Sequence, residues 1–290
     1  MRNVVVAAIQ MSCSTETEEN IENAEKLIRE AASRGGQIIL IQELFENIYF
    51  CQDIDDDYFE LAHEVENHPM LNSMSSLAKE LNVVLPISFF EKANKVYFNS
   101  LMVIDADGSQ LGVYRKTHIP DNPGYYEKYY FSPGNTGFKV WDTKYAKIGI
   151  GICWDQWFPE SARCMALMGA EMLFYPTAIG SEPSNPQEDT SFHWQMCMRG
   201  HAASNVMPVI AANRIGTEKG KMTEISFYGK SFIAGNQGNI IAEADLREET
   251  IILAEFDLDQ LERERQESVL FRDRRPEHYK TILTLDGRSK

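Results

Sequence analysis

The sequence predicts one mixed α/β domain built on two sheets. Short apolar runs of strand length alternate along the chain with segments whose apolar residues recur every three or four positions, as a helix with one buried face requires. The first of these elements form a strand, a helix and a second strand within residues 4–41. No stretch rich in Pro, Gly or Ser divides the 290 residues, so we expect a single domain over 1–290.

The N-terminal unit begins with a strand over 4–11, which is rich in β-branched and small apolar residues. Gly35 and Gly36 end the helix that follows. The apolar face of this helix consists of Ile21, Ala24, Leu27, Ile28, Ala31 and Ala32. The next strand, 37–41, is apolar without alternation, which is typical of a strand covered on both faces.

The remaining elements continue the alternation of strands and helices. Helices are expected at about 68–81, 160–168 and 190–206. Asp107-Gly108 is typical of a hairpin turn between two strands. Further strands are expected at about 83–90, 96–104, 147–153, 171–175, 208–213, 230–235, 239–244 and 250–256.

Charge and cysteine content exclude several classes of partner. The chain carries 28 Lys and Arg against 43 Asp and Glu, a net charge of −15. Nucleic acid and anionic membranes would be repelled over most of such a surface, whereas a cationic small molecule would not. No run approaches the roughly 18 apolar residues that span a bilayer. Five cysteines without a Cys-x-x-Cys pair argue against a disulfide framework and favour a reducing cytoplasm.

No metal site is expected. His63-Glu64 and His68 resemble a zinc-protease signature, but the second histidine follows after five residues instead of four. On a helix this step turns it away from the first, so the two could not share an ion. The acidic residues at 53–57 lack the Gly and terminal Glu of an EF-hand loop, and we interpret them as a solvated loop.

Three residues with useful chemistry follow predicted strands. Cys153 ends the strand 147–153 just before a predicted helix, and a helix N-terminus or a cation lowers the pKa of a thiol. Glu43 leaves a buried strand, where an unpaired carboxylate is costly. Lys116 follows the predicted hairpin. Taken singly, each residue also has an ordinary structural interpretation: Cys153 as a core thiol, Glu43 as a surface carboxylate and Lys116 as a solvated lysine.

Together the segments around these residues resemble the nitrilase superfamily of carbon–nitrogen hydrolases, whose catalytic set is Glu, Lys and Cys in this order. The resemblance extends from Val-Ala-Ala-Ile-Gln at 6–10 to Arg-Asp-Arg-Arg-Pro at 272–276. Its most specific pieces are Gln-Glu-Leu-Phe (42–45), Arg-Lys-Thr-His-Ile-Pro (115–120) and Gly-Ile-Cys-Trp-Asp (151–155). The resemblance implies an αββα sandwich, no organic cofactor, and a homo-oligomer of two or more copies.

The same resemblance implies a mechanism. Cys153 is the nucleophile, and Glu43 is the general base that takes the thiol proton and later activates water. Lys116 and the backbone N–H of Trp154 stabilise the charge that develops on the carbonyl oxygen. Glu127 matches a second active-site glutamate, which orients Lys116 or shares in proton transfer.

Within the superfamily, the strings at 42–52, 118–131 and 176–183 look most like the branch that converts N-carbamoylputrescine to putrescine, ammonia and carbon dioxide in polyamine synthesis. Such a substrate ends in an ammonium group, so its pocket needs a carboxylate or carbonyl groups. Glu182 is our candidate for this partner. Asn122 and Tyr126 lie in the string 118–131 and are expected to shape the pocket.

Two alternatives stay open. A β-ureidopropionase or another N-carbamoyl amino-acid hydrolase would need a cation for the substrate carboxylate, and Arg199 or Arg214 could supply it. A catalytically silent member would act as a binding or scaffold protein, although all three catalytic residues are present. The C-terminal tail, about 266–290, is expected to take part in oligomer contacts. Its candidate anchors, which could equally pack within the monomer, are Leu270, Phe271 and Tyr279.

Overall fold

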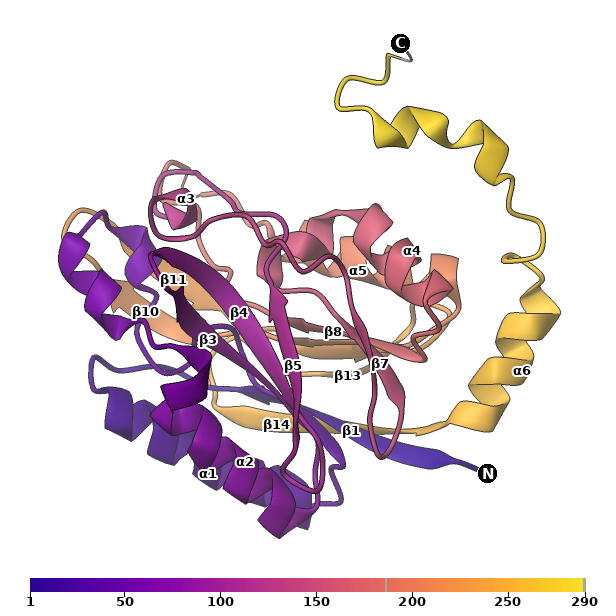
Figure 1. Cartoon of the computed structure of the whole chain (residues 1–290), viewed down its shortest axis with the longest axis horizontal. Helices are drawn as coiled ribbons and strands as arrows, with labels where there is room; N and C mark the ends of the chain where they lie inside the picture. Colours follow the sequence, from indigo (N-terminus) through magenta and orange to yellow (C-terminus); the bar gives the residue numbers. More distant parts are fainter. Residues whose placement is uncertain (186, 289–290) are drawn as a thin grey trace.

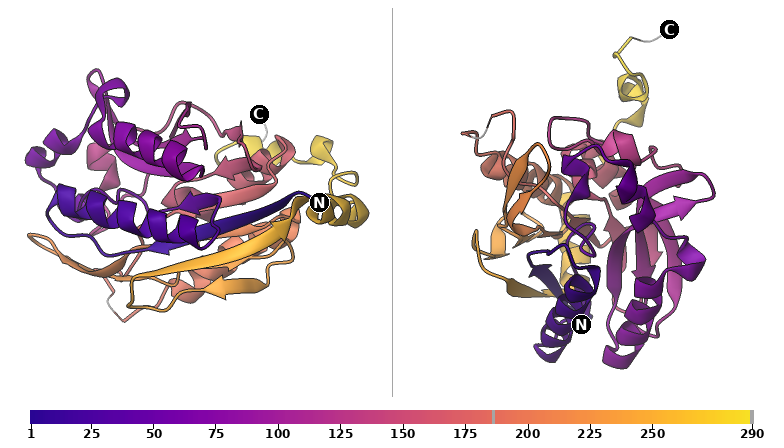
Figure 2. Two further views of the ribbon diagram at one scale, coloured as in Figure 1. Left: turned by 90° about the horizontal axis from the view of Figure 1, so that it is seen from below. Right: turned by 90° about the vertical axis from the view of Figure 1, so that its left-hand side faces the viewer.

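Two β-sheets packed face to face form the centre of the protein, and helices cover both outer faces (Figures 1 and 2). The structure is a computed structural model that describes residues 1–185 and 187–288. The architecture is an αββα sandwich, as predicted.

The first sheet has six strands in the order β13-β12-β9-β8-β7-β6. The pairs β7–β8 and β8–β9 are parallel, and the other pairs in this sheet are antiparallel. In chain order its strands are β6 (Val140–Asp142), β7 (Lys147–Ile150), β8 (Met172–Pro176), β9 (Val209–Ala212), β12 (Phe232–Ala234) and β13 (Ile240–Glu243). Helices α4 (Pro159–Leu167) and α5 (Ser191–Asn205) pack on its outer face.

The second sheet consists of two three-stranded parts, β14-β1-β2 and β3-β4-β5. Backbone hydrogen bonds join them, from Ile39 N to Val84 O at 3.0 Å and from Val84 N to Gln37 O at 2.8 Å. Helices α1 (Thr17–Ser33) and α2 (Pro69–Leu81) cover its outer face. Its strands are β1 (Asn3–Gln10), β2 (Ile38–Leu40), β3 (Leu85–Ala93), β4 (Val96–Ile104), β5 (Gln110–Arg115) and β14 (Thr250–Asp257).

Strand β1 shows why the strands lack an apolar–polar alternation. Val4, Val6 and Ala8 point into the core between the two sheets. Ala7 and Ile9 point the other way, into the layer that packs against α1 and α2. Because successive side chains of a strand face opposite sides and both sides are covered, the positions between the polar end residues Asn3 and Gln10 are all apolar.

The structure contains several elements that the sequence patterns did not indicate. The hairpin of β10 (Ile215–Lys219) and β11 (Glu224–Tyr228) is rich in polar residues, and β6 is only three residues long. Helix α6 (Leu258–Ser268) buries only two side chains, so it has no apolar periodicity. The short helix α3 (Glu127–Tyr130) was also not predicted. Helices of the 3₁₀ type occupy Phe50–Gln52, Asp56–Leu61, Val65–Asn67, Cys153–Trp157, Pro276–His278 and Lys280–Leu283.

We predicted that His63 and His68 could not share an ion because they would face apart on one helix, and this reason is wrong. These residues do not lie on one helix: His63 pairs with strand β3 and a 3₁₀ turn follows it, so the two rings approach to 5.0 Å between centroids. Within residues 1–185 and 187–288, three His, Cys, Asp or Glu side chains nowhere gather as metal ligands.

The acidic loop at 53–57 is not wholly solvated, contrary to our interpretation. Asp53 is buried, and its carboxylate accepts the backbone N–H groups of Lys221 at 2.6 Å and Met222 at 3.2 Å. Asp55 forms an ion pair with the Lys221 side chain. These contacts fasten the turn between β10 and β11 to the body of the protein.

After α6 the chain extends away from the sandwich (Figure 1). Phe271 packs against the layer of α4 and α5, with the Arg163 guanidinium 5.0 Å from its ring centroid. The last part of the tail instead exposes Ile282, Leu283 and Leu285. In the described part of the chain, no helix is both long and apolar enough to cross a membrane.

Candidate active site

Four side chains predicted from the sequence lie together in the interior. Glu43 follows β2 and Lys116 follows β5, whereas Cys153 follows β7 and Glu127 begins α3. Each is at most 5% exposed. The structure thus brings together residues from both sheets, because each sheet sends a strand end to the same place.

Lys116 lies between two carboxylates. Its Nζ donates to Glu43 Oε1 at 2.8 Å and to Glu127 Oε2 at 2.6 Å. Asn99 Nδ2 donates to Glu43 Oε1 at 2.6 Å, and the Tyr49 hydroxyl donates to Glu127 Oε1 at 2.7 Å. Among the described residues, Glu43 Oε2 has no hydrogen-bond partner. This oxygen is free to accept a proton.

The charges of this cluster shift each other's ionisation. Burial lowers the pKa of Lys116, but Glu127 and Glu43 outweigh it, and the net pKa is well above the ordinary value. Burial raises the pKa of Glu127 to about 7, against the opposing effect of Lys116. Lys116 is therefore charged at neutral pH.

The thiol of Cys153 is not acidified, contrary to our expectation from its place before a helix. Burial raises its pKa well above the ordinary value, and Glu43 adds to this effect, while Lys116 opposes it. One nearby cation does not outweigh desolvation together with two carboxylates. The resting site holds a thiol, so the nucleophile needs a base to ionise it.

The backbone turns sharply at Cys153, which has a φ of +41°. Strand β7 consequently ends at Ile150, three residues before the predicted boundary. A φ in this region is strained for a residue with a side chain and persists where the surroundings enforce it. The turn lifts the thiol out of the sheet at the strand end.

Asp155 holds the cysteine segment against the lysine segment. Its Oδ2 accepts from Ile152 N at 3.0 Å and from the Tyr114 hydroxyl at 2.7 Å. Its Oδ1 is bonded to both the backbone N–H and the Nδ1 of His118, at 3.0 and 2.7 Å. The segments that carry Cys153 and Lys116 are therefore fixed to each other.

The residues expected to bind substrate occupy different environments. Trp154 is half-buried, and its backbone N–H lies in the first turn of a 3₁₀ helix, where N–H groups have no acceptor within the helix. Tyr126 is half-buried and donates its backbone N–H to Cys51 O at 2.8 Å. Asn122 lies in an exposed turn that it closes with Tyr125 through backbone hydrogen bonds.

Glu182 is a half-buried carboxylate whose pKa burial raises. No ion pair with a cation of the described chain neutralises it. The Tyr125 hydroxyl anchors the preceding residues, because it donates to Ser181 O at 3.1 Å and accepts from Gly180 N at 3.1 Å. The loop of Glu182 is thus attached to the segment that carries Glu127.

The two arginines considered for a substrate carboxylate are engaged elsewhere. Arg199 Nε donates to Gly238 O at 2.7 Å, on the outer side of α5. Arg214 is completely buried and donates to backbone carbonyls and to Glu218 Oε1 at 2.6 Å. The Arg214 guanidinium is therefore not available to a bound ligand, whereas Arg199 is half-buried and its bond to Gly238 lies in the turn between β12 and β13.

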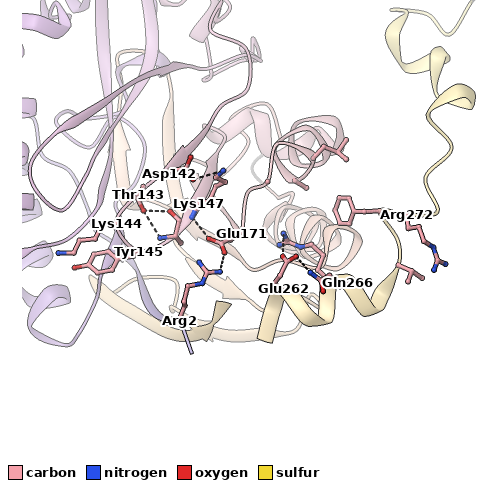
Figure 3. Close-up of a pocket in the computed structure, with 17 residues that line it drawn as sticks. Arg2, Asp142, Thr143, Lys144, Tyr145, Lys147, Glu171, Glu262, Gln266 and Arg272 are labelled. Carbon is pink, nitrogen blue, oxygen red and sulfur yellow. Dashed lines mark hydrogen bonds and ion pairs between the residues drawn. The ribbon is translucent and has the colours of Figure 1, made fainter. Parts of the chain in front are cut away.

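A large surface cavity lies apart from these residues. It has a volume of about 1000 Å³ and lies between the β6–β7 turn, the end of α4 and helix α6 (Figure 3). None of the four clustered residues lines it. Arg2 pairs with Glu171 at 2.6 Å and Lys147 with Asp142 at 3.0 Å, so these cations are already neutralised.

Sequence reasoning missed two side chains that bond directly to the cluster, Asn99 and Tyr49. Asn99 had a signal, because it is a polar residue within the apolar strand β4, where it must find a buried partner. Tyr49 had no such signal in the sequence, because its aromatic ring fits a core position equally well. The role of Arg214 as a buried backbone donor was also not foreseen.

A buried thiol, a carboxylate with a free oxygen and a fixed ammonium at the sheet ends of an αββα sandwich define a hydrolase. The chain belongs to the carbon–nitrogen hydrolase family, whose sequence profile matches residues 5–266. The predicted resemblance to the nitrilase superfamily is therefore confirmed, and the protein hydrolyses C–N bonds.

Individual relatives cover almost the whole chain. The N-carbamoylputrescine amidase of Arabidopsis thaliana is 57% identical over 99% of this chain and 97% of its own. The citrullinase of Francisella tularensis is 52% identical over 98% and 99%. The crystal structure of a carbon–nitrogen hydrolase from Helicobacter pylori superposes with a TM-score of 0.92 at 38% identity, over 98% of this chain and 99% of that chain.

Replacing Lys116 by Met should lower the free energy of unfolding by about 3–5 kcal/mol at pH 7, because two buried carboxylates lose their cation. The pKa of Glu127 would rise further, so the folded state would hold more protons than the unfolded state and stability would fall as pH rises. Urea denaturation at pH 5 and pH 8 measures this, and the loss should be larger at pH 8.

Lys147→Met is the matched control, because it removes an exposed ion pair with Asp142. It should change stability by no more than about 1 kcal/mol at either pH. An equal loss at pH 5 and pH 8 in Lys116→Met would contradict the electrostatic origin of the effect.

Proposed function

We propose that the protein is a cysteine amidohydrolase that cleaves N-carbamoylputrescine to putrescine, ammonia and carbon dioxide. The reaction rests on one observation above all: Glu43 Oε2 is an unoccupied acceptor in a buried cluster that also contains Cys153. The substrate rests on the high identity to the plant amidase, together with the unneutralised Glu182.

In the first step, Glu43 takes the thiol proton and Cys153 Sγ attacks the carbonyl carbon of the ureido group. A base is required because burial keeps the thiol pKa high. The carbonyl oxygen gains the negative charge. Lys116 and the backbone N–H of Trp154 are the donors that we assign to this oxygen.

The C–N bond breaks when the protonated Glu43 returns its proton to the leaving nitrogen. The carbonyl carbon stays bonded to Sγ, so hydrolysis is divided into two easier steps. Glu43 then takes a proton from water, which attacks the same carbon and releases Cys153 with a new proton. The carbamic acid that leaves the enzyme loses carbon dioxide, so of the two nitrogen products, ammonia and putrescine, one leaves when the C–N bond breaks and the other is released from the carbamic acid.

Glu127 has a supporting role in this scheme. Its Oε2 accepts from Lys116 at 2.6 Å, while its Oε1 is held by the Tyr49 hydroxyl. This arrangement aims the ammonium at the position of the reacting carbonyl and keeps it charged. The alternative role, sharing in proton transfer, is supported by the pKa of about 7 to which burial raises this carboxyl.

We assign the distal ammonium of the substrate to Glu182. A half-buried carboxylate without a cationic partner loses less solvation on binding an ammonium than an exposed one does. Tyr126 and Trp154 are half-buried and are our candidates for the walls of this pocket. Asn122 is exposed, and we assign it at most a place at the rim.

The rival substrates differ in the charge at their distal end. N-carbamoyl amino acids carry a carboxylate there, and citrulline carries a carboxylate beside its ammonium. Both need a free cation in the pocket. Arg214 is buried and bonded to the protein itself, and Arg199 is bonded to Gly238 in the β12–β13 turn; this observation favours the diamine derivative.

A comparison of kcat/KM tests the substrate. N-carbamoylputrescine should exceed N-carbamoyl-β-alanine, citrulline and an uncharged ω-amide by about tenfold or more, which corresponds to roughly 1.4 kcal/mol. Cys153→Ala should remain folded without turnover. If the β-alanine derivative or citrulline were cleaved best, the substrate assignment would be wrong. A folded Cys153→Ala with full activity would refute the mechanism.

A silent scaffold protein is distinguished by chemical labelling. Iodoacetamide should modify Cys153 with parallel loss of turnover, as peptide mass analysis would show.

The role of Glu182 is tested by Glu182→Gln. Loss of a charge-assisted hydrogen bond of about 1.5–3 kcal/mol should lower kcat/KM for N-carbamoylputrescine by about 10- to 150-fold. The uncharged ω-amide should be hardly affected. Glu224→Gln, an exposed glutamate on β11, is the control and should leave both values unchanged. An equal loss for both substrates would mean that Glu182 does not bind the ammonium.

We further propose that the enzyme works in the cytoplasm, where its product supplies polyamine biosynthesis. All five cysteines are free thiols, including the exposed Cys164, which suits a reducing compartment. The net charge of −15 supports a cationic substrate in preference to nucleic acid or an anionic membrane surface.

We also propose that residues 1–290 form one catalytic domain that assembles with further copies. The tail from about 266 leaves the sandwich and exposes apolar side chains that its own chain does not cover, 62% of Ile282 and 84% of Leu283. Leu270 and Tyr279 are also exposed and remain candidate anchors, whereas Phe271 packs within the monomer. A second copy is the occupant that we assign to this tail.

Sedimentation equilibrium tests this assembly. The double variant Ile282→Ser, Leu283→Ser should form smaller species than the unmodified chain at the same concentration, because the apolar contact is lost. Met222→Ser removes an equally exposed apolar side chain from the β10–β11 hairpin and should leave the mass unchanged. An unchanged mass in the double variant would exclude the tail from the interface.

A further inference from the structure

A buried arginine supports the segment that carries Glu43. Arg214 follows strand β9 and is completely buried. Its Nη2 donates to Glu43 O at 3.1 Å and Leu44 O at 2.9 Å, and its Nη1 donates to Asn47 O at 2.9 Å. One guanidinium therefore fixes three backbone carbonyls of residues 43–47.

Glu218 connects this arginine to the other end of the segment. It lies on β10, and its Oε1 accepts from Arg214 Nη1 at 2.6 Å. Its Oε2 accepts the backbone N–H of Tyr49. The Tyr49 hydroxyl in turn bonds to Glu127. Arg214 thus bonds directly to the backbone of Glu43, and through Glu218 and Tyr49 it is connected to the Glu127 carboxylate.

The segment needs this support because it is not regular structure. Leu44 has a φ of +49°, a conformation that is costly for a residue with a branched side chain. The carbonyls of a buried segment must also find donors, and no strand partner supplies them here. The planar guanidinium has five N–H groups in fixed directions, and a lysine ammonium cannot match that geometry.

We infer that Arg214, paired with Glu218, is a positioning residue for the reaction: it holds residues 43–49 so that Glu43 faces the thiol of Cys153 and Tyr49 reaches Glu127. This inference rests on the proposed role of Glu43 as the base. Arg214 does not touch the substrate in this scheme and acts through the backbone of the segment.

Two conservative variants test the inference, Arg214→Lys, which keeps the charge, and Glu218→Gln, which keeps the size. A base misplaced by about 1 Å costs roughly 10²-fold, so kcat for N-carbamoylputrescine should fall by that factor while KM changes by less than about threefold. Iodoacetamide labelling of Cys153 should slow as well, because the same base ionises the thiol.

Arg265→Lys is the matched control. Arg265 on α6 also donates to two backbone carbonyls, Ala170 O at 3.2 Å and Val206 O at 3.4 Å, but it does not contact the 43–49 segment. The Arg265→Lys variant should leave kcat, KM and the rate of Cys153 labelling unchanged. Circular dichroism and thermal unfolding establish that each variant is folded before its kinetics are compared.

The possible outcomes separate this inference from the proposed function. Normal kcat in folded Glu218→Gln overturns it, even if Arg214→Lys fails to fold. A raised KM with normal kcat in Arg214→Lys overturns it too, since it would place the arginine at the substrate. Loss of kcat in Arg214→Ala that added guanidinium ion restores would support it. Full activity in Glu43→Gln, by contrast, would refute the proposed base itself.

Discussion

The buried ammonium of Lys116 is the interaction on which the site depends. It is in direct contact with two buried carboxylates, Glu43 and Glu127, and each of the three charges would be costly to bury alone. Such a cluster is stable only when its remaining oxygens find donors, and Asn99 and Tyr49 provide them. Among the described residues, Glu43 Oε2 is the carboxylate oxygen of this cluster that has no donor, and it is the oxygen to which we assign the role of base.

The excess of negative charge around this ammonium has a chemical consequence. Two carboxylates and desolvation keep the Cys153 thiol protonated in the resting site. In the mechanism that we propose, the thiolate forms only when a base removes the proton, so attack is linked to the presence of a carbonyl and of donors for its oxygen. In that mechanism the geometry of Glu43 matters more than the acidity of the cysteine. Arg214 bonds to the backbone of the Glu43 segment, and Asp155 fixes the cysteine segment to the lysine segment.

Much of the fold follows from the sequence pattern, because burial on both faces forces continuous apolar runs such as β8 and amphipathic helices such as α1. The elements that escaped prediction are those that bury little. Helix α6 has two buried side chains, and the β10–β11 hairpin is held by Asp53 as well as by its own packing. Their stability comes from contacts with distant parts of the chain, which no local pattern records.

By itself, the sequence determined the sandwich, the hydrolase family and four chemistry-bearing residues, since strand periodicity and short motifs are local properties of the chain. Only the tertiary structure decided how those residues shift each other's ionisation and how they are held in place. The ionisation of Cys153 and Glu127 depends on burial and on charges far away in sequence, and the segment at Glu43 depends on Arg214, 171 residues further on. Desolvation and Coulomb interactions act through space, so these properties exist only in the folded protein.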